Sequence, residues 1–262
     1  MRPIWKGAIS FGLVTIPIGL YSATESKRPS FRQLRKSDNS RVRNKRVAEA
    51  DGKEVGYDEI VKGYEFEKDR YVVFDGDELA ILSSRLGSTV DVVQFVDMVA
   101  VDPIYYRSSY YLAPEKSGVK AYKILHRALR DKAMVGLARV AIRDREYPAT
   151  LRAEDEVLVL ETMFWPDEIR EPKFENLEQE VEVRDDEVKM AEMIIDNLSA
   201  PFDPSQWQDD SRQAVEELAR RKIDGEEIVA SEGPVRPAGV VDLMEALKAS
   251  VEATRGRKAA SG

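Results

Sequence analysis

Short segments in which apolar and polar residues alternate recur through the chain, and they set the strongest limit on its fold. They span residues 63–74, 89–95, 104–112, 135–147 and 157–165. Alternation with a period of two places apolar side chains on one face of a strand. Many short strands separated by polar turns favour an antiparallel sandwich or barrel. We therefore expect a mainly β fold with helical additions.

The N-terminal stretch predicts two further strands joined at a glycine. Before Gly12 the apolar residues fall on one face, and after it the set changes phase to Val14, Ile16, Ile18 and Leu20. A change of phase at a glycine predicts a bulge or a sharp bend. Because proline cannot donate to a ladder, we expect Pro17 at a sheet edge or an irregularity.

One helix is expected among the strands, between Lys116 and Lys132. Its apolar stripe is Tyr122, Leu125 and Leu129. Basic residues recur at helical spacing on another face, at Lys116, Lys120, Lys123, Arg127 and Arg130. That face is either an ordinary solvated surface or one that follows phosphates, and the spacing does not decide between them. The single histidine, His126, is expected on the helix surface without a chemical role.

The C-terminal third turns helical. One helix starts near Asp185, with Val188, Ala191, Ile195 and Leu198 at helical spacing, and a second starts near Asp210, with Gln213 in a capping box. Residues 224–239 have the composition of a flexible linker. A last amphipathic helix carries Val241, Met244, Leu247 and Val251 on one face. That helix is either a docked cap or a partner-binding segment.

Composition excludes several classes of function. The chain has no cysteine, one histidine and no glycine-rich phosphate-binding motif. Disulfides, thiolate catalysis and cysteine-bound zinc are therefore excluded, and nucleotide binding has no support. Without an apolar run of membrane-spanning length or a signal peptide, we expect a cytoplasmic protein at the nucleoid. We expect no cofactor and no catalytic residue.

Charge is strongly segregated along the chain, although the net charge is −8. Residues 26–46 hold nine bases against one acid, whereas residues 149–192 hold fifteen acids against five bases. Such a molecule can bind phosphates on one side while remaining acidic in total. The basic run is either a solvated loop or a polyanion site; its members are Lys27, Arg28, Arg32, Arg35, Lys36, Arg41, Arg43, Lys45 and Arg46.

A second set of cations is expected on one strand. In residues 135–147, Arg139, Arg143 and Arg145 lie opposite the apolar Ala138, Val140 and Ile142 if the whole segment is one strand. This arginine face suits a polyanion, and a solvated surface fits equally well. The acidic clusters at 75–78, 154–156 and 185–187 fall at predicted turns and helix starts and lack a metal-ligand spacing. We expect no metal site.

Several longer motifs resemble those of bacterial Ku proteins. The opening Ile-Trp-Lys-Gly-Ala-Ile-Ser-Phe-Gly-Leu-Val at 4–14 is similar to the start of that family. Further likeness lies at 45–52, 60–65, 102–106, 110–114, 160–162 and 202–204, so the resemblance covers residues 1 to about 222 in order. Residues 240–244, Val-Val-Asp-Leu-Met, resemble the short C-terminal segment that the family uses to engage ligase D.

The resemblance implies a Ku-type β-barrel with an inserted ring-forming arm and a C-terminal helical arm. The core would span 1–186, with the DNA-embracing arm at about 26–62, the helical arm at 187–223, and a linker with a partner-binding helix at 224–262. Drawn as one hairpin of about 18 residues per leg, the inserted arm would reach roughly 60 Å.

The function implied is a non-enzymatic homodimer that binds double-stranded DNA ends without sequence preference in non-homologous end joining. DNA would be bound by the basic run together with Arg139 and Arg143, and an ATP-dependent DNA ligase D by Val241, Met244, Leu247 and Val251. Two alternatives remain open: a metal-dependent nuclease, and a protein scaffold that does not bind DNA.

Overall fold

The computed structural model describes residues 1–85, 87–143, 145–225, 246–248 and 250–251, without the side chains of 82–85. The chain forms two compact units. The first contains Met1–Lys27 and Arg32–Glu171; the second contains Arg28–Phe31 and the chain from Pro172 onward. No helix among the described residues is long and apolar enough to cross a membrane.

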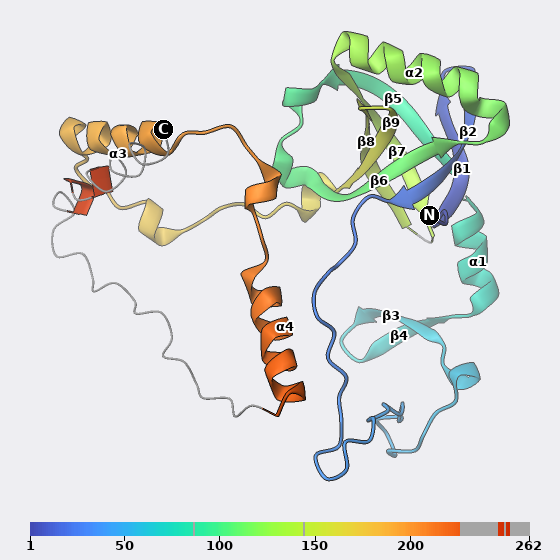
Figure 1. The fold of residues 1–262 in the computed structure, drawn as a ribbon. Helices are drawn as coiled ribbons and strands as arrows, with labels where there is room; N and C mark the ends of the chain where they lie inside the picture. Colours follow the sequence, from blue (N-terminus) through green and yellow to red (C-terminus); the bar gives the residue numbers. More distant parts are fainter. Residues whose placement is uncertain (86, 144, 226–245, 249, 252–262) are drawn as a thin grey trace. The chain divides into compact units, whose positions relative to one another are not determined.

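Seven strands of the first unit form a closed barrel, which confirms the mainly β expectation (Figure 1). Around the barrel the order is β1-β2-β6-β9-β8-β7-β5. Neighbouring strands are antiparallel except at the closing seam, where Ala8–Ser10 of β1 pair in parallel with Thr89–Asp91 of β5. The strands are β1 (Trp5–Phe11), β2 (Val14–Ser22), β5 (Thr89–Asp97), β6 (Tyr106–Pro114), β7 (Met134–Ile142), β8 (Arg145–Glu154) and β9 (Val157–Met163).

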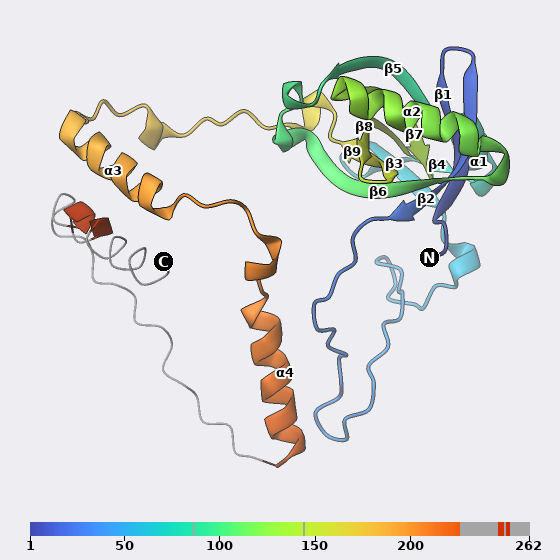
Figure 2. The ribbon, with the colours of Figure 1, turned by 45° about the horizontal axis from the view of Figure 1, so that its top comes forward.

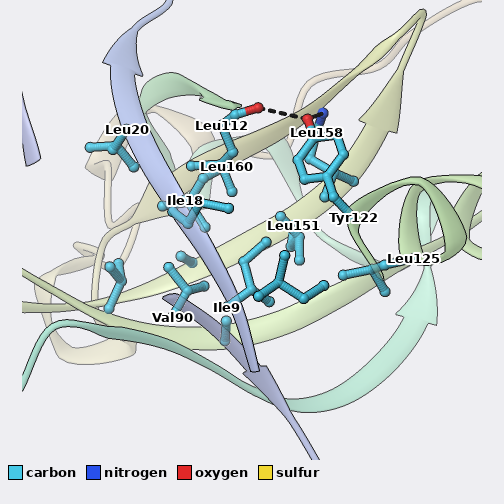
Figure 3. Close-up of a cluster of buried hydrophobic side chains, with 14 of the residues drawn as sticks. Ile9, Ile18, Leu20, Val90, Leu112, Tyr122, Leu125, Leu151, Leu158 and Leu160 are labelled. Atoms are coloured by element: carbon cyan, nitrogen blue, oxygen red, sulfur yellow. Dashed lines mark hydrogen bonds between the residues drawn. The ribbon is translucent and has the colours of Figure 1, made fainter. Parts of the chain in front are cut away.

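The barrel interior is filled by aliphatic side chains from every strand (Figure 3). Those with no exposed surface include Ile9, Ile16, Ile18, Leu20, Val90, Leu112, Leu151, Leu158 and Leu160. Helix α2 (Val119–Lys132) lies across one end of the barrel in both views (Figures 1 and 2) and adds Tyr122, Leu125 and Leu129 to the same cluster. The helical stripe expected from the sequence is therefore confirmed.

Tyr122 ties α2 to two strands of the barrel wall. Its hydroxyl donates to the Leu112 carbonyl of β6 and accepts from the Leu158 amide of β9, both at 2.6 Å (Figure 3). Burial raises the pKa of this hydroxyl, and the bond from Leu158 lowers it in part. The phenol thus stays neutral and satisfies two backbone groups that the end of the barrel would otherwise bury without partners.

His126 is buried, contrary to the expectation of a surface position. It is 8% exposed, and its Nε2 has no hydrogen-bond partner within the described residues. The reason is its spacing: residue 126 follows Tyr122 by one helical turn and precedes Leu129 by three positions, so it shares their face.

Strand directions determine what lies at the end of the barrel remote from α2. β7 begins directly after α2 and β6 ends shortly before it, so Ile142 and Tyr106 lie at the far end. Ser22 pairs with Tyr110 of β6, and Val90 pairs with Val140 of β7, so β2 ends and β5 begins at that far end too. The inserted segment 23–88 therefore leaves and re-enters the barrel at one end.

Two segments expected as single strands are hairpins. Residues 135–147 contain β7, a turn and β8, and residues 63–74 contain β3 (Lys62–Glu67) and β4 (Arg70–Phe74). Arg143 in the first turn has φ 63° and Asp69 in the second has φ 60°. The predicted bend at Gly12, with φ 59°, is the β1–β2 turn. Pro17 lies within β2, next to the end of its pairing with β6.

The remaining helices are α1 (Gly76–Arg85), α3 (Asp185–Leu198) and α4 (Asp210–Ile223). Helix α4 is capped by Asp209, whose carboxylate accepts from the Arg212 amide at 3.1 Å. The Gln213 side chain donates to Gln208 instead, so the capping box expected there does not form. Single-turn 3-10 helices occur at Tyr57–Glu59, Met98–Ala100, Pro103–Tyr105, Lys116–Gly118, Pro166–Glu168, Glu175–Leu177 and Pro204–Gln206.

The substitution Tyr122→Phe is expected to lower the free energy of unfolding by about 1–3 kcal/mol, because it leaves the Leu112 carbonyl and the Leu158 amide buried without partners. The measurement is chemical unfolding followed by circular dichroism. Tyr111→Phe is the control, because Tyr111 precedes Leu112 on β6 and is exposed. This substitution should change the free energy of unfolding by no more than about 0.5 kcal/mol. Equal effects of the two substitutions would contradict the bridging role.

Candidate nucleic-acid interface

The basic segment between β2 and β3 is built from two tight turns. In the first, Leu34 and Arg41 form an isolated bridge, and the Arg35 amide donates to the Ser40 carbonyl at 2.8 Å. In the second, Val47 and Glu54 form the bridge. Residues 23–61 contain no longer strand, so the single hairpin expected for the arm is wrong. Its polar sequence has no sustained alternation to hold two long legs together.

Hydrogen bonds within the first turn fix its conformation. The Asp38 carboxylate accepts from the Arg35 guanidinium at 2.5 Å and from the Ser40 amide at 3.1 Å. These bonds, the one from Arg35 most of all, hold the pKa of Asp38 well below its usual range. The carboxylate therefore remains ionised at neutral pH and neutralises Arg35.

The nine basic residues divide into paired and unpaired groups. Lys27 pairs with Glu25, Arg35 with Asp38, and Lys45 with Glu54, while the Arg46 guanidinium lies 5.1 Å from the centre of the Tyr57 ring. Arg28 also has an interaction. Four exposed cations make no ion pair within the described part of the chain: Arg32, Lys36, Arg41 and Arg43. These four are the side chains most available to a polyanion.

The arginines expected on one strand face are distributed over two strands and a turn. Arg139 is exposed on β7, opposite the buried Ala138 and Val140 as predicted. Arg143 lies in the β7–β8 turn, and Arg145 begins β8. The expectation of a single arginine face is therefore wrong, because the chain reverses between Ile142 and Arg145 and no glycine marks the reversal.

The β3–β4 hairpin exposes apolar side chains on both of its faces. Tyr64, which is 65% exposed, pairs with Val72 on one face, and Tyr71, which is 57% exposed, lies on the other. Phe66 and Val73 are exposed as well. Exposed apolar residues grouped on one hairpin make it a candidate interaction surface. The alternation in 63–74 predicted one strand where the structure has two, and nothing in it predicted that both faces would lack cover.

The two helices of the second unit also leave their apolar residues uncovered within the described residues. Val188, Ile195 and Leu198 of α3 and Leu218 of α4 are exposed. Of the C-terminal stripe, Val241 and Met244 lie outside the described residues. Leu247 is half-buried, and Val251 is only 7% exposed. That last side chain is therefore already packed within this chain.

Acidic residues that could be imagined as metal ligands have structural roles. The Asp75 carboxylate accepts from the Glu78 amide at 2.8 Å, and the Glu78 carboxylate accepts from the Asp75 amide at 3.0 Å, which caps α1. Glu187 likewise caps α3 through the Arg184 amide at 3.0 Å. Among the described residues, no three His, Asp or Glu side chains form a group that could hold a metal ion.

A closed seven-stranded barrel with a segment that carries a basic run inserted between β2 and β5 defines the class of protein. Residues 10–190 match the family model described as the Ku70/Ku80 beta-barrel domain. The chain therefore belongs to the Ku family, as a relative of the bacterial non-homologous end joining proteins.

Three curated relatives illustrate the similarity, all of them named non-homologous end joining protein Ku. The protein of Frankia casuarinae is 47% identical over 97% of this chain, which spans 64% of that relative. The protein of Desulfitobacterium hafniense is 41% identical over 98% of this chain and 90% of its own length. The protein of Mycolicibacterium smegmatis is 35% identical over 98% and 84%.

Proposed function

We propose that this protein binds the ends of double-stranded DNA as a ring-shaped homodimer, without sequence preference, and recruits a DNA ligase to them. The observation that carries DNA contact is the group of four exposed, unpaired cations in the inserted arm: Arg32, Lys36, Arg41 and Arg43. A ring can load only where a duplex has an end, so its topology converts non-specific phosphate attraction into recognition of a break. No bond-making step is assigned to this chain.

Contact through phosphates explains both the residue types and the absence of sequence preference. Arginine and lysine bind phosphate oxygens, which position a protein on DNA but carry no sequence information. The aromatic residues nearest the two turns in the sequence are Phe31 and Tyr57, and the latter already lies against Arg46. Base stacking by a row of aromatic side chains, as in single-strand binders, therefore has little support here.

Replacing Arg32, Lys36, Arg41 and Arg43 together by glutamine is expected to weaken binding to unrelated duplexes equally. The slope of log affinity against log salt concentration should shrink by about 0.9 for each phosphate that is no longer neutralised. Fluorescence anisotropy over a salt series measures both quantities. A comparison variant removes four charges from the basic face of α2 and the turn before it, through Lys116→Gln, Lys120→Gln, Lys123→Gln and Arg127→Gln; it also tests whether that face follows phosphates. If both variants weaken binding alike, the arm is not the principal phosphate contact, and either total charge or the α2 face contributes equally.

The exposed β3–β4 hairpin supports assembly into a dimer. An isolated two-stranded hairpin is marginally stable in water, and this one has apolar residues on both faces. A second copy offers the same surface, as a twofold interface requires. Covering Tyr64, Tyr71 and their apolar neighbours would remove aromatic surface from water, which is the main favourable term in association. If the inserted segments 23–88 of two copies pair through this hairpin, they close a ring around a duplex.

Substituting Tyr64→Ser with Val72→Ser is expected to shift the protein from dimer to monomer in sedimentation at micromolar concentration. The same variant should bind linear and closed-circular DNA alike. A closed ring is excluded from a circle, whereas an arm that does not close can contact either form. Leu13→Ser with Val93→Ser, which removes two exposed apolar residues of the barrel, is the matched control. A monomeric wild-type protein with full end binding would refute the ring.

The alternatives have weaker support. A nuclease needs carboxylates free to bind metal ions, whereas Asp75, Glu78 and Glu187 cap helices. A scaffold without DNA contact gives no reason for unpaired cations concentrated in one inserted segment. The relatives of this chain are named for end joining, which favours DNA ends as the partner.

We further propose that the C-terminal stripe of Val241, Met244, Leu247 and Val251 recruits the ligase, named by the resemblance as ligase D. Burying one such aliphatic side chain is worth about 1.5–3 kcal/mol, so a few of them can hold a partner after ordering costs are subtracted. Because Val251 is already buried in this chain, its share of that contact requires the side chain to leave its present packing.

Truncation after Gly225 is expected to leave end binding nearly intact and to abolish stimulation of end joining by a purified ligase. Anisotropy on a linear duplex and a gel-based ligation assay measure the two activities. Val251→Ser in the full-length chain is a companion variant, because it tests the packing of that residue alone. If truncation lowers the melting temperature and DNA affinity together, the segment caps the protein and recruitment must be abandoned.

A further inference from the structure

A hollow lined by arginines lies at the end of the barrel remote from α2. It has a volume of about 380 Å³ and is lined by Ile4, Tyr110, Ile142, Arg143, Arg145 and Tyr147. Its residues come from the start of the chain, from β6 and from the β7–β8 hairpin. Arg143 and Arg145 are its only charged lining residues among those described.

The position of this hollow follows from the strand directions. Ile142 ends β7, Arg145 begins β8, and Tyr110 pairs with Ser22 at the end of β2. The inserted arm leaves the barrel after Ser22, so the hollow and the root of the arm lie at the same end. A group bound in the hollow would therefore lie at the end of the barrel from which the arm with the basic run extends.

The positive charge of the hollow is not neutralised within the described residues. Neither Arg143 nor Arg145 has an ion pair there; Asp144 lies outside the described residues. A contrasting case on β8 is Arg152, which pairs with Glu154 and with Glu161, the latter at 3.1 Å. The same strand thus carries one arginine saturated by carboxylates and another that faces an open hollow.

Aromatic residues give this cationic site a fixed wall. The Tyr147 ring holds the guanidinium of Arg107 at 5.4 Å, and the Phe164 ring holds it at 5.3 Å. Arg107 has no ion pair within the described residues, so it adds a third uncompensated charge beside the lining. The hydroxyls of Tyr110 and Tyr147 make no hydrogen bond among the described residues and can donate to a bound anion.

Backbone strain occurs at Arg143, one of the two lining arginines. Its φ of 63° lies in the left-handed region, which glycine and asparagine adopt more easily. An arginine at a turn position that favours asparagine or glycine destabilises the fold slightly. Binding by its guanidinium offers a reason for that cost.

We propose that this hollow binds a phosphate group with at least three unesterified oxygens, as in inorganic phosphate or in a phosphomonoester at the end of a chain. Such a group carries about −1.5 to −2 charges near pH 7, which matches the two lining arginines, and it presents three acceptor oxygens to guanidinium forks and phenol hydroxyls. Its source is either the 5′-phosphate of a DNA end or free phosphate ion. The first source rests on the proposed function, and the second does not.

The test uses a pair of full-length variants with equal charge change. Arg143→Asn with Arg145→Gln removes both lining charges, and asparagine tolerates the left-handed conformation at 143. Lys120→Gln with Lys123→Gln removes two exposed charges from α2 at the opposite end. Melting temperatures without phosphate verify folding, and the first variant should melt no lower than the wild type.

Two measurements separate the sources. The first compares melting temperatures in inorganic phosphate and in chloride at equal ionic strength. Phosphate should raise the melting temperature of the wild type and of the α2 control, and it should raise that of the hollow variant less. In the second, the wild type and the α2 control should bind a 5′-phosphorylated duplex about tenfold tighter than its 5′-hydroxyl counterpart. The hollow variant should bind both duplexes alike.

Each other outcome has a definite meaning. Phosphate protection that is equal in all three proteins, or absent, overturns the hollow as a phosphate site. Protection specific to the intact hollow without any 5′-phosphate preference assigns free phosphate as the occupant and overturns the DNA source. If no duplex is bound at all while that protection persists, the proposed function fails and the phosphate site stands.

Discussion

Closure of the barrel through the parallel pairing of β1 with β5 is the constraint on which the other features depend. Residues Ala8–Ser10 meet Thr89–Asp91, and between them the chain has made a hairpin and an inserted segment. Because β2 ends and β5 begins at the same end of the barrel, both roots of that segment are anchored close together. Because both ends of the inserted segment are fixed to the same end of a rigid barrel, the segment leaves the barrel in a defined direction even though it has little regular structure of its own.

Charge pairing, more than charge number, distinguishes the side chains that can act on a partner. The basic run at 26–46 holds nine bases, yet Arg35 and Lys45 are engaged by carboxylates while Arg41 and Arg43 are not within the described residues. Exposed ion pairs contribute little to stability. Their effect here is to make the paired cations less available to a bound polyanion. The same distinction separates Arg152 from the arginines of the hollow, and it makes an acidic protein of net charge −8 compatible with phosphate binding.

Sequence patterns predict the barrel strands, the apolar stripe of α2 and the basic run, because alternation and helical spacing report burial directly. They fail where a non-glycine residue reverses the chain: Arg143 carries no signal for the left-handed conformation that ends a strand, and Asp69 carries only a weak one. The surface position expected for His126 is wrong because its helical spacing from Tyr122 outweighs the polar character of its side chain. The hollow could not be predicted, because it joins residues from β6, β7 and β8 that only closure brings together.

The uncovered β3–β4 hairpin has a consequence for how the molecule unfolds. The barrel has a continuous buried core and can melt as one cooperative unit, whereas the hairpin has almost no interior of its own. A single midpoint temperature would then average two processes with different enthalpies and different dependence on concentration. Amide hydrogens in β3 and β4 should exchange with solvent far sooner than those in β8, so the hairpin that we propose as the dimer contact is also the segment with the least cooperativity.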